Sequence, residues 1–431
     1  MKIYNQAIVI VSILFCIFFH SMTLAKSTIK IGIVAFLSGG AASSFGIPHR
    51  NGYEFMFDAI NNGSVPFPYN TPGIGGAKIE YFFVDEAGGA TKQVTEYRNL
   101  VERQGVDIVM GYISSGDCLA IPPVAEELKK LTILSDCGTP RVFEENNYKY
   151  VFRTGPHAAM DNVSAARYIF KRGIKVETVA GINQNYAWGQ DSWADFSMSL
   201  KSLYKDINIV SEQFPKIFAG QYGAEVSALS IAKPDVIHSS FWGSDLEAFV
   251  LQAQARRLFK NSTIIFSAGD HVLPSLGKNM PDGVIIGARG PHGDLAPDSP
   301  LGNWFKTNMA KRYNIKQTTQ PMHKAAMAVL FVKKAYDLAF EKTGKFPNQE
   351  QVIEVMEGLE WDSPSGLVSM ALGNGHQAIQ DTAIGITKWD PDENRVKIID
   401  IERFNAKCVN PPEGIKAIDW IAGGFKGAEC N

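Results

Sequence analysis

Two strand-to-loop junctions in this sequence carry residues suited to holding a small anion. They occupy residues 106–116 and 131–140. Each begins with an apolar run short enough for a buried parallel strand, and each ends in small residues with hydroxyls and free backbone N–H groups. Ligands of open α/β sheets bind beyond the carboxyl ends of the strands. Two neighbouring junctions of this kind therefore predict a cradle for a carboxylate.

The sequence offers little for covalent or phosphoryl chemistry. It contains neither a G-x-S-x-G elbow nor a P-loop. His238 and His271 are expected at strand ends near the cradle, but no orienting partner can be named for either, so both are interpreted as polar or structural residues. Capture is favoured over conversion, and we expect no enzyme activity and no cofactor. An exported hydrolase is the alternative.

The first 25 residues have the features of a secretory signal peptide. Lys2 supplies a charged start, residues 7–19 are almost wholly apolar, and Thr23-Leu24-Ala25 is a small-residue cleavage site. The apolar segment is short for a transmembrane anchor, which is the alternative interpretation. We expect a soluble, exported, periplasmic protein.

Composition limits the partners and the number of domains. With 42 basic and 44 acidic residues the net charge is −2 and no basic stripe is present, which argues against nucleic acid. About 400 residues beyond the leader exceed what one core usually supports, so two domains are expected. We expect the protein to be a monomer.

Four cysteines remain beyond the leader, and three pairings are possible. Cys118 and Cys137 flank adjacent strand ends, whereas Cys408 and Cys430 share a tail rich in proline and glycine. We predict disulfides within these two pairs. Zinc is the alternative, but CxxC and clustered histidine spacings are missing, so no metal site is expected.

Strand and helix signals alternate along most of the chain, which predicts an α/β fold with two doubly wound lobes joined by multiple crossovers. We assign residues 26–153 and 288–370 to the first lobe. The second lobe is assigned residues 154–287 and 371–431. Several crossovers form a hinge, and the cleft between the lobes is the expected binding site.

The chain resembles the periplasmic solute-binding proteins of ABC importers, in the leucine/isoleucine/valine-binding group with the type I fold. The resemblance covers nearly all of the chain beyond the leader. It is carried by the order and spacing of several short motifs: Ile31-Gly32-Ile33 with Leu37-Ser38-Gly39, residues 111–115, Gly138-Thr139-Pro140, residues 185–189, and Leu251-Gln252-Ala253.

The resemblance implies a role for seven residues. Ser115 and Thr139 correspond to residues whose hydroxyls bind the ligand carboxylate, and Gly138 corresponds to a residue that binds it through the backbone. Capping of helix ends by these hydroxyls is the alternative. Asp270 corresponds to the acid that holds the α-amino group, although family members that bind leucine usually carry a longer acid there. A helix cap or a surface charge is the alternative for Asp270. Aromatic residues at family positions are expected to close over the ligand, namely Phe45, Trp188 and Trp242.

The resemblance implies a substrate-binding protein that captures a small carboxylate, above all a branched-chain or other hydrophobic amino acid, and delivers it to a membrane permease. A ligand-sensing receptor or an amide- or aromatic-acid-binding protein of the same fold is the alternative. Tryptophan at positions where the family has tyrosine indicates a pocket of different shape.

Overall fold

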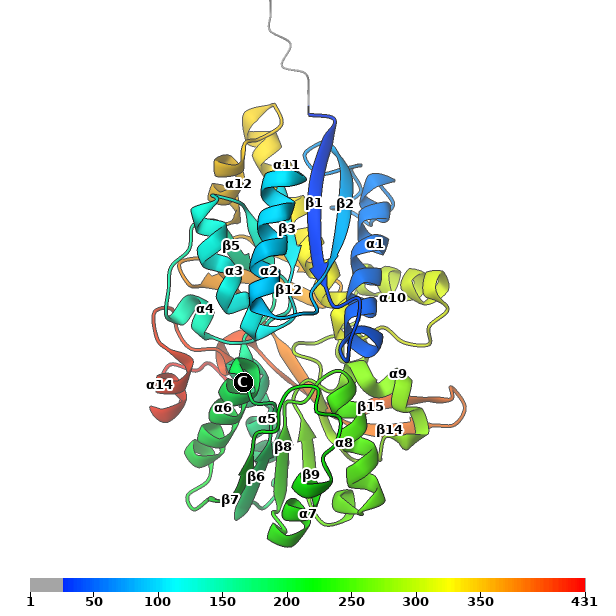
Figure 1. The fold of residues 1–431 in the computed structure, drawn as a ribbon, viewed down its shortest axis with the longest axis vertical. Coiled ribbons are helices and arrows are strands. Elements are labelled where there is room, and N and C mark those ends of the chain that lie inside the picture. Colours follow the sequence, from blue (N-terminus) through cyan, green and yellow to red (C-terminus); the bar gives the residue numbers. More distant parts are fainter. Residues whose placement is uncertain (1–25, 431) are drawn as a thin grey trace, which may run out of the picture.

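The computed structural model describes residues 26–430 as two α/β lobes placed end to end (Figure 1). The predicted signal peptide lies outside the described residues. Each lobe has one mixed sheet covered by helices on both faces. In β1 (Thr28–Ala35), Ile33 and Val34 belong to the hydrophobic cores on opposite faces, because side chains alternate along a strand. The prediction of two doubly wound α/β lobes is confirmed.

The first lobe contains an eight-stranded sheet in the order β11-β12-β13-β5-β4-β3-β1-β2. Strands β1 to β5 pair in parallel, and β13 also pairs in parallel with β5. Beyond β13 the pairing is antiparallel, between β13 and β12 and between β12 and β11. After β1, the strands are β2 (Lys78–Asp85), β3 (Ile108–Gly111), β4 (Thr132–Leu134), β5 (Val151–Arg153), β11 (Glu360–Ser363), β12 (Gly366–Leu372) and β13 (Gln377–Gln380). The helices are α1 (Ile47–Asn61), α2 (Ala90–Arg98), α3 (Ser115–Glu127), α4 (Arg141–Glu144), α10 (Pro300–Tyr313), α11 (Gln320–Thr343) and α12 (Gln349–Met356).

The second lobe contains a seven-stranded sheet in the order β15-β14-β10-β9-β8-β6-β7. The long hairpin of β14 and β15 adds the antiparallel edge. The strands are β6 (Thr178–Ile182), β7 (Asn208–Gln213), β8 (Val236–Ser239), β9 (Thr263–Phe266), β10 (Ile285–Gly287), β14 (Thr382–Asp390) and β15 (Arg395–Phe404). The helices are α5 (Ala158–Lys171), α6 (Ala187–Leu203), α7 (Gly223–Ala232), α8 (Ser244–Ala255), α9 (Leu273–Leu276), α13 (Ala406–Val409) and α14 (Ala417–Ala422).

The chain passes between the lobes three times, after β5, after β10 and after β13. The predicted boundary between residues 370 and 371 is wrong, because it falls inside β12. A glycine-containing turn, Gly373-Asn374-Gly375, reverses the chain after β12, and β13 then pairs with β5 through Gln377 and Arg153. The first lobe therefore continues to Gln380.

Both predicted disulfides are present. Cys118 of α3 is bonded to Cys137 in the loop after β4, and Cys408 of α13 is bonded to Cys430 near the end of the chain. The first disulfide thus joins the two junctions expected to form the cradle. Across residues 26–430, no helix combines the length and apolarity needed to cross a bilayer.

Candidate functional site

A small cavity lies between the two lobes, at the carboxyl ends of strands from both sheets. Its volume is about 10 Å³, so a solute can enter only when the lobes move apart. Five of the seven predicted binding residues line it, and Thr139 and Asp270 do not. The first lobe contributes Phe45, Ile113, Ser115, Gly138 and Gln320, and the second contributes Tyr186, Trp188, Trp242, Ala268 and Arg289.

The two predicted junctions meet through Ser115, the first residue of α3. The chain turns sharply out of β3 at Gly111, whose φ is +118° and where a side chain would clash with the Val34 carbonyl. Ser115 Oγ then accepts hydrogen bonds from the backbone N–H groups of Gly138 and Thr139, each at 3.1 Å. A hydroxyl has two lone pairs, so only the Ser115 O–H remains for a ligand, as a donor.

The amides of the first junction are held by a buried carboxylate that was not predicted. Glu86 accepts from the backbone N–H of Ile113 at 2.8 Å and of Ser114 at 2.7 Å. Burial, and then the nearby Asp117, raise the pKa of Glu86 above its ordinary value. These amides therefore have an internal partner, which corrects the expectation that they are free for a ligand anion.

Thr139 contributes to contact between the lobes. Its hydroxyl donates to Asp191 Oδ2 at 2.6 Å, and Arg141 Nη2 pairs with Asp191 Oδ1 at 2.6 Å. Asp191 belongs to α6 of the second lobe, whereas Thr139 and Arg141 follow β4 of the first. In this conformation the Thr139 hydroxyl points to the other lobe and not into the cavity.

Four of the ten residues that line the cavity are aromatic. Phe45 lies in a π-helical turn, Ala42–Gly46, and packs edge-on against Trp242 with ring centres 5.3 Å apart. The Trp242 indole N–H donates to the Tyr186 hydroxyl at 2.8 Å, and that of Trp188 donates to the Ser240 carbonyl at 2.8 Å. Both indoles are thus fixed in orientation while their rings remain available for packing. Tyr186 lies within a motif noted in the sequence, but it was not assigned a binding role.

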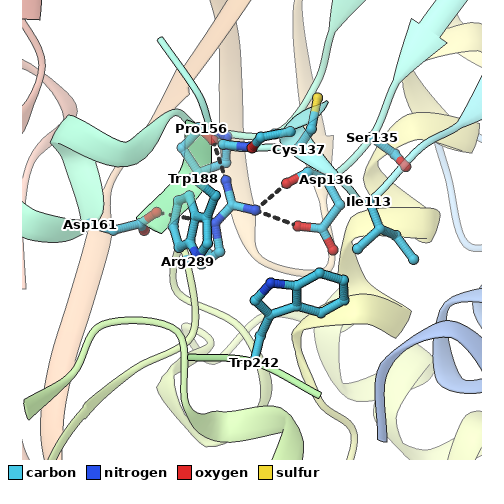
Figure 2. Close-up of polar contacts among 12 residues, drawn as sticks. Ile113, Ser135, Asp136, Cys137, Pro156, Asp161, Trp188, Trp242 and Arg289 are labelled. Atoms are coloured by element: carbon cyan, nitrogen blue, oxygen red, sulfur yellow. Dashed lines mark hydrogen bonds and ion pairs between the residues drawn. The ribbon is translucent and has the colours of Figure 1, made fainter. Parts of the chain in front are cut away.

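Arg289, which follows β10, is the one charged side chain among the described residues that line the cavity. Its Nη1 donates to the Asp136 carbonyl and, at 2.8 Å, to Asp136 Oδ1 (Figure 2). Its Nε donates to Asp161 at 3.2 Å, and its Nη2 to the Pro156 carbonyl at 2.8 Å. The guanidinium also lies over the Trp188 ring, with its carbon 4.5 Å from the ring centre.

One N–H of Arg289 remains available for a ligand. A guanidinium has five N–H groups in a fixed fork, and the contacts above use four of them. The fifth is on Nη2, the Arg289 atom that borders Gly138. A Cβ at position 138 would clash with the Trp188 ring, so glycine there allows both side chains to reach the cavity.

Asp270 begins a short 3-10 turn, Asp270–Val272, and is almost fully buried beside the cavity. Its Oδ2 accepts from the backbone N–H of Gln320 at 2.8 Å, which fixes the start of α11 in the other lobe. Its Oδ1 has no hydrogen-bond partner among residues 26–430. Burial raises the pKa of Asp270 to about 8. The predicted role as partner of an ammonium stays a prediction.

Glu86, Tyr186, Arg289 and Gln320 are the site residues that the sequence did not reveal. Tyr186 alone carried a usable signal, because it lies beside Trp188 in the motif 185–189. Within residues 26–430, no cluster of three or more His, Cys, Asp or Glu side chains has an arrangement that could hold a metal ion.

The sequence and the fold were compared with known proteins. Residues 28–393 match the family model described as periplasmic binding protein. A Leu/Ile/Val-binding protein homolog 4 from Brucella abortus is 24% identical over 230 residues, which are 51% of each chain. The chain thus spans about half the length of the curated relatives that it matches.

Several solved structures share the fold. A solute-binding protein of an ABC transporter from Rhodopseudomonas palustris BisB5, in complex with 3,4-dihydroxybenzoic acid, has a TM-score of 0.74 at 21% identity, covering 88% of this chain and 98% of that one. A leucine-, isoleucine-, valine-, threonine- and alanine-binding protein from Brucella ovis, in its closed conformation, has a TM-score of 0.71 at 20% identity, covering 90% and 97%.

Proposed function

Because this chain belongs to the periplasmic binding protein family, we propose that it captures a small carboxylate-bearing solute between its lobes and delivers it to the permease of an ABC importer. We also propose that residues 1–25 direct its export and are cleaved, which would make it a periplasmic protein. It would act as a monomer that binds its solute without converting it.

One observation carries the proposal of a carboxylate. The Ser115 O–H and the fifth N–H of Arg289 both border Gly138, and both are donors without an acceptor of their own. A carboxylate accepts through two oxygens, and hydrogen bonds to a charged acceptor are stronger than neutral ones. Aromatic walls would then enclose the apolar body of the solute.

The first candidate solute is a hydrophobic amino acid, in keeping with the name of the Brucella abortus relative. Its ammonium would need a buried carboxylate partner, because an unpaired buried charge is very costly. Asp270 Oδ1, which is buried and unpartnered, is the group proposed for this role.

The second candidate is an aromatic acid without an ammonium. The observation in its favour is the cavity lining, which holds four aromatic side chains and a cation. Structural neighbours include one solved with benzoate, at a TM-score of 0.75 and 16% identity.

Thermal shift and calorimetry on the mature protein test the proposal. The panel is leucine, phenylalanine, 3-phenylpropanoate and benzoate, and mass spectrometry of the recovered solute checks that it is unchanged. A solute at one hundred times its dissociation constant should stabilise the fold by about 2.7 kcal/mol. Phenylalanine binding much more tightly than 3-phenylpropanoate would support the ammonium role, and equal binding would reject it. If no carboxylate in a wider panel of amino and aromatic acids binds, the proposed function is wrong.

A further inference from the structure

Gln320 lines the cavity, and neither end of its buried side-chain amide has a partner among the described residues. It is the first residue of α11, its side chain is 0% exposed, and it lines the cavity. Both Oε1 and Nε2 lack a hydrogen-bond partner among the described residues. Buried polar side-chain atoms in folded proteins are nearly always paired, so this exception calls for an explanation.

No hydrogen bond joins the Gln320 carboxamide to the other polar side chains that line the cavity among the described residues. Ser115 Oγ already accepts twice, and Arg289 is directed to Asp136, Asp161 and Pro156. Ser115 and Arg289 each retain one donor, and neither donates to Gln320 Oε1 in this structure. In the proposed function the solute carboxylate would accept from these two donors. The carboxamide is therefore the one group of the described lining whose acceptor and donors are all unpaired, because the Tyr186 hydroxyl already accepts from Trp242 Nε1.

The backbone of Gln320 is fixed, which lets its side chain discriminate between solutes. Its N–H donates to Asp270 Oδ2 at 2.8 Å, across the boundary between the lobes. Asp270 therefore positions the residue, and closure of the lobes brings its side chain to the cavity. A preorganised polar group penalises solutes that leave it unpaired.

We propose that Gln320 is a specificity residue that selects a hydroxylated carboxylate over its non-hydroxylated counterpart. The inference rests on the proposed function. A hydroxyl can donate to Oε1 and accept from Nε2, so one group satisfies both ends of the carboxamide. A hydroxyl also needs no countercharge. A cationic group would face Arg289, the one charged residue of the described lining.

Calorimetry on the wild-type protein with matched pairs tests the selection. The probes are benzoate with its 3- and 4-hydroxy derivatives, and 3-phenylpropanoate with its 4-hydroxyphenyl analogue. We expect at least one hydroxylated member to bind ten-fold or more tightly than its parent. Equal affinities within every pair would overturn the inference and leave carboxylate capture standing. Binding of none of these acids, together with binding of amino acids, would overturn it in favour of the ammonium role.

Two variants then assign the selection to this residue. Gln320→Met preserves length and removes both polar ends, so the ratio of affinities within the preferred pair should fall to about one. Gln380→Met is the matched control, because Gln380 is also buried, at 3% exposed, and both ends of its amide also lack a partner among the described residues, but it lies outside the cavity lining. It should keep the wild-type ratio. A ratio unchanged in folded Gln320→Met would refute the assignment, and the wild-type ratio is measurable even if that variant does not fold.

Discussion

The two carboxylate oxygens of Asp270 lie in different environments. One carboxylate oxygen fixes the start of α11 and the other is buried without a partner. Burial raises the pKa of Asp270 from 3.8 to about 8. In the solute-free protein the group is therefore mostly protonated at neutral pH, whereas a bound ammonium would favour its charged form.

This pKa gives a prediction for Asp270→Asn. The folded protein keeps a proton on Asp270 between about pH 4 and 8 that the unfolded chain releases. The stabilisation from this group is complete below pH 4 and is lost as the pH rises to 8. Asparagine stays neutral at every pH and can still accept from the Gln320 N–H. Between pH 4 and 8, the free energy of unfolding of the variant relative to wild type should therefore rise by at most about 1.4 kcal/mol for each pH unit. Urea unfolding at pH 5, 6.5 and 8 measures the difference.

The control for that series is Asp282→Asn, an exposed carboxylate paired with Lys388. Its difference from wild type should stay nearly constant over the same range. A constant difference for Asp270→Asn as well would show that Asp270 ionises without cost. In that case the carboxylate would already be charged in the solute-free protein.

At the scale of elements, the sequence predicted those parts of the site that local pattern determines. The apolar runs of β3 and β4 and the small residues after them identified the junctions around Ser115 and Gly138. Cysteine positions identified both disulfides. These features depend on neighbours in the sequence, and a parallel sheet brings successive strand ends together.

Other parts of the site depend on contacts that local pattern does not encode. Arg289 reaches the cavity only because β10 lies in the second sheet, more than 150 residues from Asp136 along the chain. Gln320 reaches it because Asp270 fixes the start of α11. The hairpins of β11–β13 were also missed, since β11 is a four-residue strand with two acidic residues and gives almost no strand signal.

The two disulfides close loops of similar length and therefore form a matched pair. Their sequence separations are 19 and 22, so removing either by Cys→Ser substitution at both positions should cost about 3 kcal/mol of unfolding free energy. Loss of Cys118–Cys137 should in addition weaken solute binding, because Cys137 directly precedes Gly138. Loss of Cys408–Cys430 should leave the dissociation constant nearly unchanged. Chemical unfolding and calorimetry on both double variants check these expectations. Equal solute affinities of the two double variants would show that the Cys118–Cys137 disulfide does not preorganise the cradle.

At the scale of the whole molecule, the proposed function requires that the lobes separate and close. The cavity is too small to admit a solute in this conformation, so solute capture as proposed would require exchange between open and closed forms. Contacts that cross between the lobes set this equilibrium. Asp191 of α6 makes such contacts, because it accepts from Thr139 and pairs with Arg141. Solute affinity depends on the fraction of closed protein, so these residues can tune binding without touching the solute.

Asp191→Ala should shift the equilibrium toward the open form. Asp191 is 11% exposed and Arg141 is 37% exposed at the side chain, so solvent weakens the ion pair, while the Thr139 hydrogen bond is better shielded. Together the lost contacts should weaken solute binding by about 1–2 kcal/mol.

The free energy of unfolding within each lobe should change little, because no core residue is altered. Small-angle X-ray scattering of the solute-free protein should show a larger radius of gyration, and calorimetry should show the weaker affinity. Asp58→Ala is the control, since it breaks an Asp–Arg ion pair of 2.7 Å with Arg312 inside the first lobe, against 2.6 Å for Arg141–Asp191. It should change neither measurement. An unchanged affinity in Asp191→Ala would show that the bound solute alone holds the lobes together, and that the contacts of Thr139 and Arg141 only follow closure.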